Sequence, residues 1–189
     1  MLTGYFIKGF QSFSQPTAIN LKAKNYKILT DTNTTDGILK GLMFVGANAS
    51  GKSNIVLALK LLLDLLFAKT DISIANKQCK FGDDEIFLQY EFLIEKSEII
   101  YTVEYSCAKK ITTEKLTLDG EILLDRIGSN ATETTSGEKK FYDKIQDGSL
   151  ILREIYFNSK FRNNDTLYKW FSFLMNSIYI DLYKQDVSN

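Results

Sequence analysis

The feature that most constrains this chain is the stretch Gly46–Ser53, with the sequence GANASGKS. It matches the pattern G-x-x-x-x-G-K-[ST], which forms a phosphate-binding loop between a strand and a helix in nucleotide-handling proteins. The preceding run Leu42–Val45 is apolar and predicts a buried strand. The following segment, Asn54–Phe67, is rich in Leu, lacks Gly and Pro, and predicts a helix. Strand, loop and helix therefore follow one another in the order that the motif requires.

Each part of the motif has a physical role. Gly46 and Gly51 lack a Cβ, so the backbone can lie close to a phosphate. Backbone N–H groups and the positive end of the following helix dipole would attract the anion. Lys52 is expected to contact the β- and γ-phosphates of ATP, and the Ser53 hydroxyl to bind Mg²⁺, which prefers oxygen ligands. The predicted binding residues are Gly46, Ala47, Asn48, Ala49, Ser50, Gly51, Lys52, Ser53 and Asn54.

Composition restricts the other classes of function. The chain has 189 residues, 23 Lys plus Arg, 23 Asp plus Glu and no His. This length suits one domain, and the zero net charge gives no general attraction to nucleic acid or membranes. The lack of His excludes Ser-His-Asp and Cys-His catalysis and disfavours a zinc site. Two cysteines, no signal-peptide pattern and no membrane-length apolar run predict a cytoplasmic protein.

Alternating apolar residues predict a sheet. Leu2–Phe10 and Thr17–Leu21 are expected to form an antiparallel pair at a sheet edge, and residues 86–127 a four-stranded antiparallel meander. The helix after the glycine-bounded loop is apolar around most of its circumference, which predicts burial on several sides. The predicted fold class is α/β: a phosphate-loop (P-loop) NTPase lobe with a mixed sheet and an added antiparallel meander, spanning residues 1–189 as one domain.

The remaining segments give simpler predictions. Gly128–Lys140 is rich in Ser, Thr and Gly and predicts a loop. Leu150–Phe157 fits a strand or a helix, and a final helix over 166–178 is expected, capped by Asp165 and burying Trp170. Lysines 22, 24 and 27 are interpreted as protection of a strand edge, and Cys79 and Cys107 as buried hydrophobic side chains.

Three pieces of the chain resemble the N-terminal part of ABC-type AAA-family ATPases, relatives of SMC, RecF and overcoming-lysogenization-defect proteins. Ile7–Phe13 is similar to the family's opening strand, usually Ile-x-Asn-Phe-[Arg/Lys]-Ser-Phe, and Gly46–Asn54 matches the family's phosphate loop along its whole length. The paired strands within Ile86–Tyr105 are similar to the family's sheet after the first helix. The resemblance implies binding of ATP and Mg²⁺, a single incomplete N-terminal lobe, and a role like that of the many family members in bacterial anti-phage systems.

The chain departs from the family pattern in two places. Gln11 stands where the family has a basic residue that can approach the nucleotide. Hydrolysis also needs acidic residues for Mg²⁺ and for the attacking water. The nearest candidate is Ser177–Asp181, which Leu182 follows instead of a second acid, so no catalytic residue is assigned. Thr135–Lys139 resembles the family's signature loop but is interpreted as a surface loop, and Asn158 is a candidate for the Mg²⁺-sensing position.

Three functions follow, and whether the chain is itself an enzyme stays open among them. The first is an ATP-binding half of an ABC-type ATPase, in which a missing C-terminal half or a partner chain in a dimer completes hydrolysis. The second is a non-hydrolysing nucleotide-binding module whose aromatic-rich hairpins bind another protein. The third is a fragment of a DNA-repair ATPase, which the neutral charge balance does not support.

Overall fold

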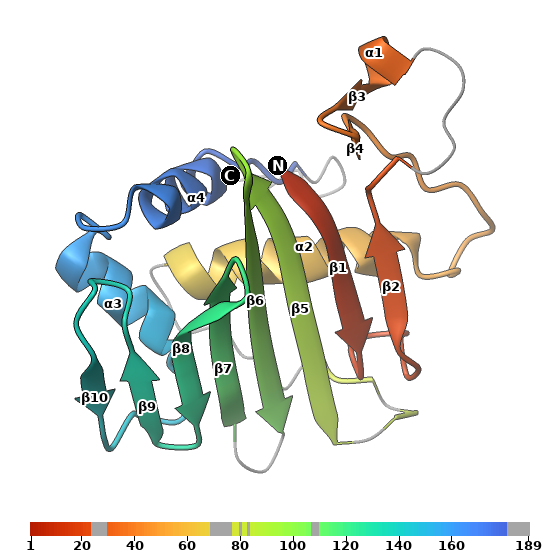
Figure 1. Ribbon diagram of the computed structural model, residues 1–189. Coiled ribbons are helices and arrows are strands. Elements are labelled where there is room, and N and C mark those ends of the chain that lie inside the picture. The colour runs from red at the N-terminus through yellow and green to blue at the C-terminus, as the bar shows by residue number, and fades with distance from the viewer. Residues whose placement is uncertain (24–29, 69–76, 80, 83, 107–109, 181–189) are drawn as a thin grey trace, which may run out of the picture.

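The computed structural model describes residues 1–23, 30–68, 77–79, 81–82, 84–106 and 110–180. The fold is α/β, with one large sheet and helices packed on one of its faces (Figure 1). The elements are β1 (Leu2–Lys8), β2 (Thr17–Asn20), α1 (Thr30–Asn33), β3 (Thr34–Thr35), β4 (Ile38–Leu39), α2 (Lys52–Phe67), β5 (Glu85–Ile94), β6 (Ser97–Ser106), β7 (Lys110–Leu118), β8 (Glu121–Ile127), β9 (Asn130–Glu133), β10 (Lys140–Tyr142), α3 (Ile151–Ser159) and α4 (Asp165–Met175).

The large sheet has eight strands in the order β10-β9-β8-β7-β6-β5-β1-β2. All of its neighbouring strands pair antiparallel, including β1 with β5, so the expected mixed sheet is wrong for the described part of the chain. The reason is the connectivity, because only a few residues separate each of the strands β5 to β10 from the next, and short connections join antiparallel neighbours. The separate pair β3-β4 lies outside this sheet.

The expected meander is confirmed and is longer than predicted. Strands β5 to β8 cover residues 86–127, and β9 and β10 continue the sheet into Gly128–Lys140, where the composition predicts a loop. In β9, Ala131 and Glu133 are buried while their neighbours are less covered, which is the period of a half-buried strand. The sequence pattern does not reveal this short strand because only Ala131 among its residues is apolar.

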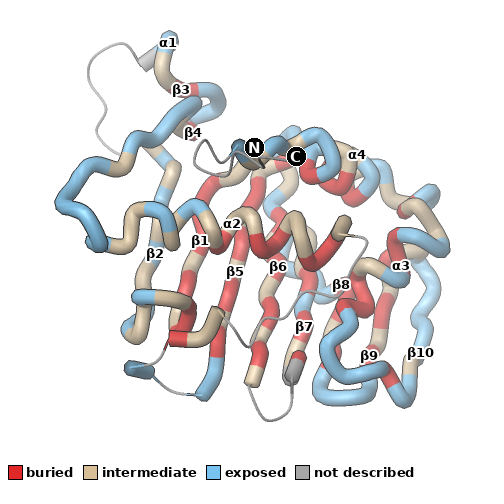
Figure 2. Tube along the Cα trace, turned by 180° about the vertical axis from the view of Figure 1, so that it is seen from behind, coloured by how far each residue is buried: buried red, intermediate tan, exposed pale blue. Residues whose placement is uncertain are grey.

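Helix α2 crosses the buried face of the sheet (Figures 1 and 2). Two sheet tyrosines donate hydrogen bonds to its main chain, Tyr5 to Ile55 O at 3.1 Å and Tyr90 to Ala58 O at 2.7 Å. Burial raises the pKa of both hydroxyls above the ordinary value, so both remain neutral donors. One side of α2 is buried through Ala58, Leu61, Leu62, Leu65 and Leu66.

The opposite side of α2 is only partly buried, so the expected burial on several sides is incomplete in the described structure. Val56 is 39% exposed, and Leu59 and Leu63 are half-buried. Within the described residues, one face of this apolar helix is fully covered and the other is partly covered.

The C-terminal part of the chain completes the core. Leu150–Phe157 belongs to the helix α3, which settles the two alternatives left by the sequence. The cap of α4 is Asn164, whose side chain accepts from Leu167 N at 3.0 Å, one residue before the predicted Asp165. Helix α4 ends at Met175 rather than 178, and Trp170 is fully buried, as predicted.

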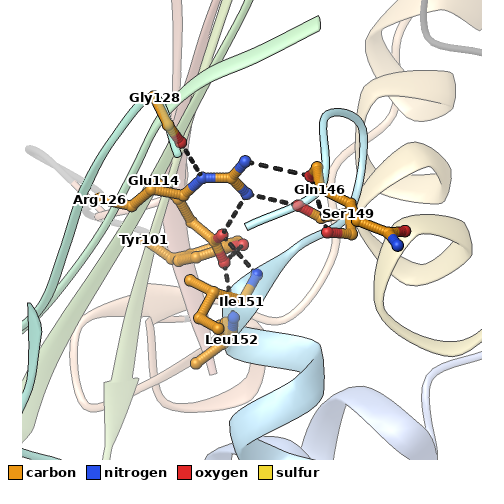
Figure 3. A network of polar contacts seen from close by, with 8 residues as sticks. All are labelled: Tyr101, Glu114, Arg126, Gly128, Gln146, Ser149, Ile151 and Leu152. Atoms are coloured by element: carbon orange, nitrogen blue, oxygen red, sulfur yellow. Dashed lines mark hydrogen bonds and ion pairs between the residues drawn. The ribbon is translucent and has the colours of Figure 1, made fainter. Parts of the chain in front are cut away.

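A buried ion pair joins α3 to the sheet (Figure 3). Glu114 and Arg126 are both 0% exposed, with 3.7 Å between the carboxylate Oε2 and the guanidinium NH1. The Glu114 carboxylate also accepts from Tyr101 OH at 2.7 Å, Ile151 N at 2.8 Å and Leu152 N at 2.9 Å. The carboxylate therefore caps the N-terminus of α3, where unpaired N–H groups favour an anion.

The remaining donors of Arg126 are also occupied. Its guanidinium donates to the backbone oxygens of Gly128, Ser149 and Gln146. Burial raises the pKa of Glu114, and the hydrogen bonds from Tyr101, Leu152 and Ile151 and the Arg126 charge oppose that rise. A pair with so many partners fixes where α3 begins relative to β7 and β8.

We expect Glu114→Gln to lower the free energy of unfolding by about 3–5 kcal/mol, because it leaves the Arg126 charge buried without its counterion. Chemical denaturation measures this loss. The matched control is Glu121→Gln, at an exposed position of the adjacent strand, which should change stability by no more than about 0.5 kcal/mol. Equal effects of the two substitutions would show that the buried pair does not hold the fold together.

Candidate phosphate-binding site

The predicted loop leads into an uncapped helix N-terminus. Gly51 is the N-cap residue of α2, with φ of 87°, and no side chain caps the helix there. The first hydrogen bond along the helix is donated by Ile55 N to Gly51 O at 3.2 Å. The amide N–H groups of Lys52, Ser53 and Asn54 therefore have no acceptor within the helix, and the positive end of the helix dipole lies at the same place.

The loop folds around the ammonium group of Lys52. Lys52 Nζ donates to Gly46 O at 2.8 Å, to Ala47 O at 2.5 Å and to Ser50 Oγ at 3.3 Å. Gly46 to Ser50 and Ser53 are exposed, so the loop backbone and the Ser53 hydroxyl are open to solvent. The structure thus brings the predicted residues together into one accessible turn at the start of α2, where a cation and unpaired N–H groups meet. Such an arrangement suits an anion.

The strand predicted before the loop is not formed. Leu42, Met43 and Val45 are 45%, 81% and 79% exposed, and within the described residues the run 42–45 pairs with no strand. The prediction of a buried strand is wrong for this chain because its apolar residues find no neighbouring sheet to join. Instead, residues 40–45 connect the end of β4 to the loop without forming a helix or a strand.

Sequence reasoning missed the contact between the loop and the turn joining β1 to β2. A Cβ atom added at Gly51 would lie 2.9 Å from Ser12 Oγ and 3.5 Å from the Phe13 ring. Asn54 Nδ2 also donates to Ser12 Oγ at 2.9 Å. The sequence Gln-Ser-Phe in this turn is the one signal that could have predicted the contact with the loop. Ser12 makes that contact, whereas Gln11 donates its backbone N–H to Lys77 O.

The other candidate residues lie away from the loop. Asn158 is exposed near the end of α3, and Arg153 of that helix donates to Leu65 O at 3.4 Å. Leu65 lies about 20 Å along the α2 axis from Lys52, so α3 packs near the end of α2 that is far from the loop, and the Mg²⁺-sensing role of Asn158 stays a prediction. Thr135–Lys139 lies between β9 and β10; Gly137–Lys139 is exposed, as expected of a surface loop, whereas Thr135 is buried and donates to the Glu133 carboxylate.

The candidate acidic strand is also not formed. Ser177–Ile180 is neither helix nor strand, with Ile178 84% and Ile180 71% exposed, and Asp181 lies outside the described residues. Tyr179 contacts Lys60, with 5.6 Å between Nζ and the ring centroid, so this segment passes the middle of α2 rather than the loop.

Several smaller predictions have mixed outcomes. Cys79 is buried, as predicted, whereas Cys107 lies outside the described residues. Lys22 is exposed and pairs with Glu98, and lysines 24 and 27 fall outside the described part.

No three Cys, Asp or Glu side chains among the described residues converge to form a metal site. None of the helices there has the length and apolar character needed to cross a membrane.

Comparisons with protein-family models and with curated proteins gave no match to this chain.

We expect Gly51→Ala to lower the free energy of unfolding by about 2–3 kcal/mol, because the new methyl group meets Ser12 and Phe13 and the backbone is left-handed. Chemical denaturation measures the loss. Gly137→Ala is the control, because Gly137 has φ of 86° but a methyl group there would have nothing within 4 Å, and only the backbone penalty of about 1 kcal/mol applies. If both variants lose the same stability, the loop does not pack against the β1–β2 turn.

Proposed function

We propose that this chain binds ATP through the loop Gly46–Ser53, with Mg²⁺ held by Ser53. The observation that carries the proposal is the exposed, uncapped start of α2, around which the loop folds with the Lys52 ammonium at its centre. Unpaired N–H groups, the helix dipole and one lysine all favour a polyphosphate. When bound, Mg²⁺ would neutralise part of the phosphate charge, and the exposed Ser53 hydroxyl would supply an oxygen ligand.

Lys52 would act by exchanging partners. Its ammonium has three donors, which are directed at two backbone oxygens and the Ser50 hydroxyl. A phosphate oxygen is a stronger acceptor for an ammonium than a neutral carbonyl, because the bond is charge-assisted on both sides. Lys52 would therefore turn from the loop carbonyls toward the phosphates while the loop N–H groups close around them.

We expect Lys52→Ala to weaken Mg-ATP binding by about 10- to 100-fold, since a charged hydrogen-bond donor is lost from the site. Titration calorimetry with Mg-ATP measures the affinity. Lys60→Ala is the control, because Lys60 lies on the same helix and pairs with Asp64; it should bind Mg-ATP as the unmodified chain does. Equal affinity of the Lys52→Ala variant and the unmodified chain would end the ATP assignment.

We further propose that the chain is the N-terminal lobe of an ABC-type ATPase and that a second lobe completes it. Two exposed apolar features support this proposal: the run Leu42–Val45, which forms no strand in the described structure, and the partly covered side of α2 with Val56. A groove of about 180 Å³ lies along that side of α2, between Leu59 and Leu63 of the helix and Phe173, Ile178 and Tyr179 of the C-terminal part of the chain.

A sheet is the partner that fits both features. A run that pairs with no strand in the described structure can take a β-strand as its neighbour, and the apolar face of a helix packs on the face of a sheet. The second lobe would thus supply strands beside 42–45 and a sheet face over α2. Hydrolysis would depend on acidic residues of that lobe, since none has been assigned in this chain.

We expect the double substitution Met43→Lys, Val45→Lys to change the free energy of unfolding of this chain by no more than about 0.5 kcal/mol, because both side chains are exposed. In a longer natural form that carries the second lobe, the same change should abolish steady-state ATP hydrolysis. Leu88→Lys, at a buried position of β5, is the contrasting control and should unfold the chain. A large loss of stability from the double substitution would mean that 42–45 packs within this lobe, and the second-lobe proposal would fall.

A further inference from the structure

A hydrogen bond between side chains 42 positions apart joins the first turn of α2 to the turn after β1. Asn54 Nδ2 donates to Ser12 Oγ at 2.9 Å. The same hydroxyl oxygen lies 2.9 Å from the position that a Cβ would occupy on Gly51, so the turn lies directly against the end of the loop. Ser12 and Asn54 therefore meet at the point where the unpaired N–H groups of α2 begin.

The turn Gly9–Phe13 is itself fixed to the sheet. Phe10 is 1% exposed, and Gln11 N donates to Lys77 O at 2.7 Å. Cys79 N donates to Gly9 O, also at 2.7 Å. Gly9 has φ of 68°, and a Cβ there would lie 1.9 Å from Glu85 O, so the backbone approaches β5 as closely as only glycine allows. Ser12 is thus carried by a rigid support.

The first half of the loop has no comparable support in the described structure. Gly46 to Ser50 are exposed, and their contacts are the three hydrogen bonds from Lys52 and one from Ser50 N to Ala47 O at 3.4 Å. If Lys52 turns toward a phosphate, those three bonds are given up. The Tyr5 hydrogen bond to Ile55 O then still holds the first turn of α2 on the sheet, and the contact of Ser12 with Asn54 and Gly51 still holds the end of the loop.

We infer that Ser12 and Asn54 are positioning residues for the nucleotide site, an inference that rests on the proposed ATP binding. Their hydrogen bond holds the first turn of α2 against the fixed β1–β2 turn, so the N–H groups of Lys52 and Ser53 face the phosphates before the nucleotide arrives. Binding then orders only the Gly46–Ser50 half of the loop. Preorganisation of this kind raises affinity because less conformational entropy is lost on binding.

The test is titration calorimetry with Mg-ATP on four variants and the unmodified chain. Ser12→Ala and Asn54→Ala should each weaken binding roughly two- to tenfold, the range for loss of one hydrogen bond. The double variant should bind no more weakly than either single variant, because both changes remove the same contact. Ser12→Thr keeps the hydroxyl and should bind like the unmodified chain.

Two measurements separate positioning from a general loss of structure. Ser14→Ala, in the same turn, is the matched control and should leave the affinity unchanged. The thermal midpoint of the ligand-free Ser12→Ala chain should stay within about 1 °C of the unmodified chain, because Ser12 is exposed. Ser12→Thr should retain full affinity, because it keeps the hydroxyl. If Ser12 acted through packing alone, the added methyl group would disturb that packing and weaken binding.

The outcomes distinguish this inference from the proposed function. If Lys52→Ala abolishes binding while Ser12→Ala binds like Ser14→Ala, ATP binding stands and the positioning role is overturned. Additive effects of Ser12→Ala and Asn54→Ala would overturn it too, because two independent contacts would then be involved. If the unmodified chain and Lys52→Ala show the same affinity, or neither binds Mg-ATP, the proposed function fails and the inference fails with it.

Discussion

The packing of α2 across one face of the antiparallel sheet is the interaction on which the rest of the structure depends. The strands bury every second side chain, and α2 covers the central part of that face. Tyr5 and Tyr90 extend from neighbouring strands and donate hydrogen bonds to backbone oxygens of α2. These bonds fix the position of the helix along the sheet, which apolar contact alone does not do because it has no direction. The start of α2, and with it the loop, is therefore placed by the sheet.

The two ends of the molecule differ in how firmly their elements are attached to the sheet. At one end, α3 is attached through Glu114 and Arg126, a buried ion pair whose partners are main-chain groups and a tyrosine. A pair of this kind contributes specificity of attachment more than net stability, because burying both charges is costly. At the other end, the loop and its approach are exposed and make few contacts. A rigid core with an open loop at a helix N-terminus is the arrangement expected for binding a ligand.

Exposed apolar side chains lie before the loop, on α2 and after α4, and the proposed second lobe would cover some of them. Met43 and Val45 precede the loop, Val56 lies on the outer side of α2, and Ile178 follows α4, and all four are exposed. A second lobe that adds strands beside 42–45 would cover the first three.

The sequence by itself determined the features that rest on local patterns. Period-two alternation predicted β5 to β8, and the Leu-rich run predicted α2. The two glycines with Lys52 predicted the loop that leads into α2. Such patterns involve residues within a few positions of each other, so one chain segment contains the whole signal. Leu150–Phe157 stayed ambiguous because a short apolar run fits both periods.

Only the tertiary structure decided which segments meet. The antiparallel pairing of β1 with β5, the exposure of Leu42–Val45, and the contact of Ser12 with Asn54 all join or separate residues far apart in the chain. The capping of α3 by Glu114 is of the same kind, since the carboxylate comes from 37 positions earlier than Ile151. Whether an apolar run becomes a buried strand depends on a neighbour to pair with, and that neighbour is not encoded in the run itself.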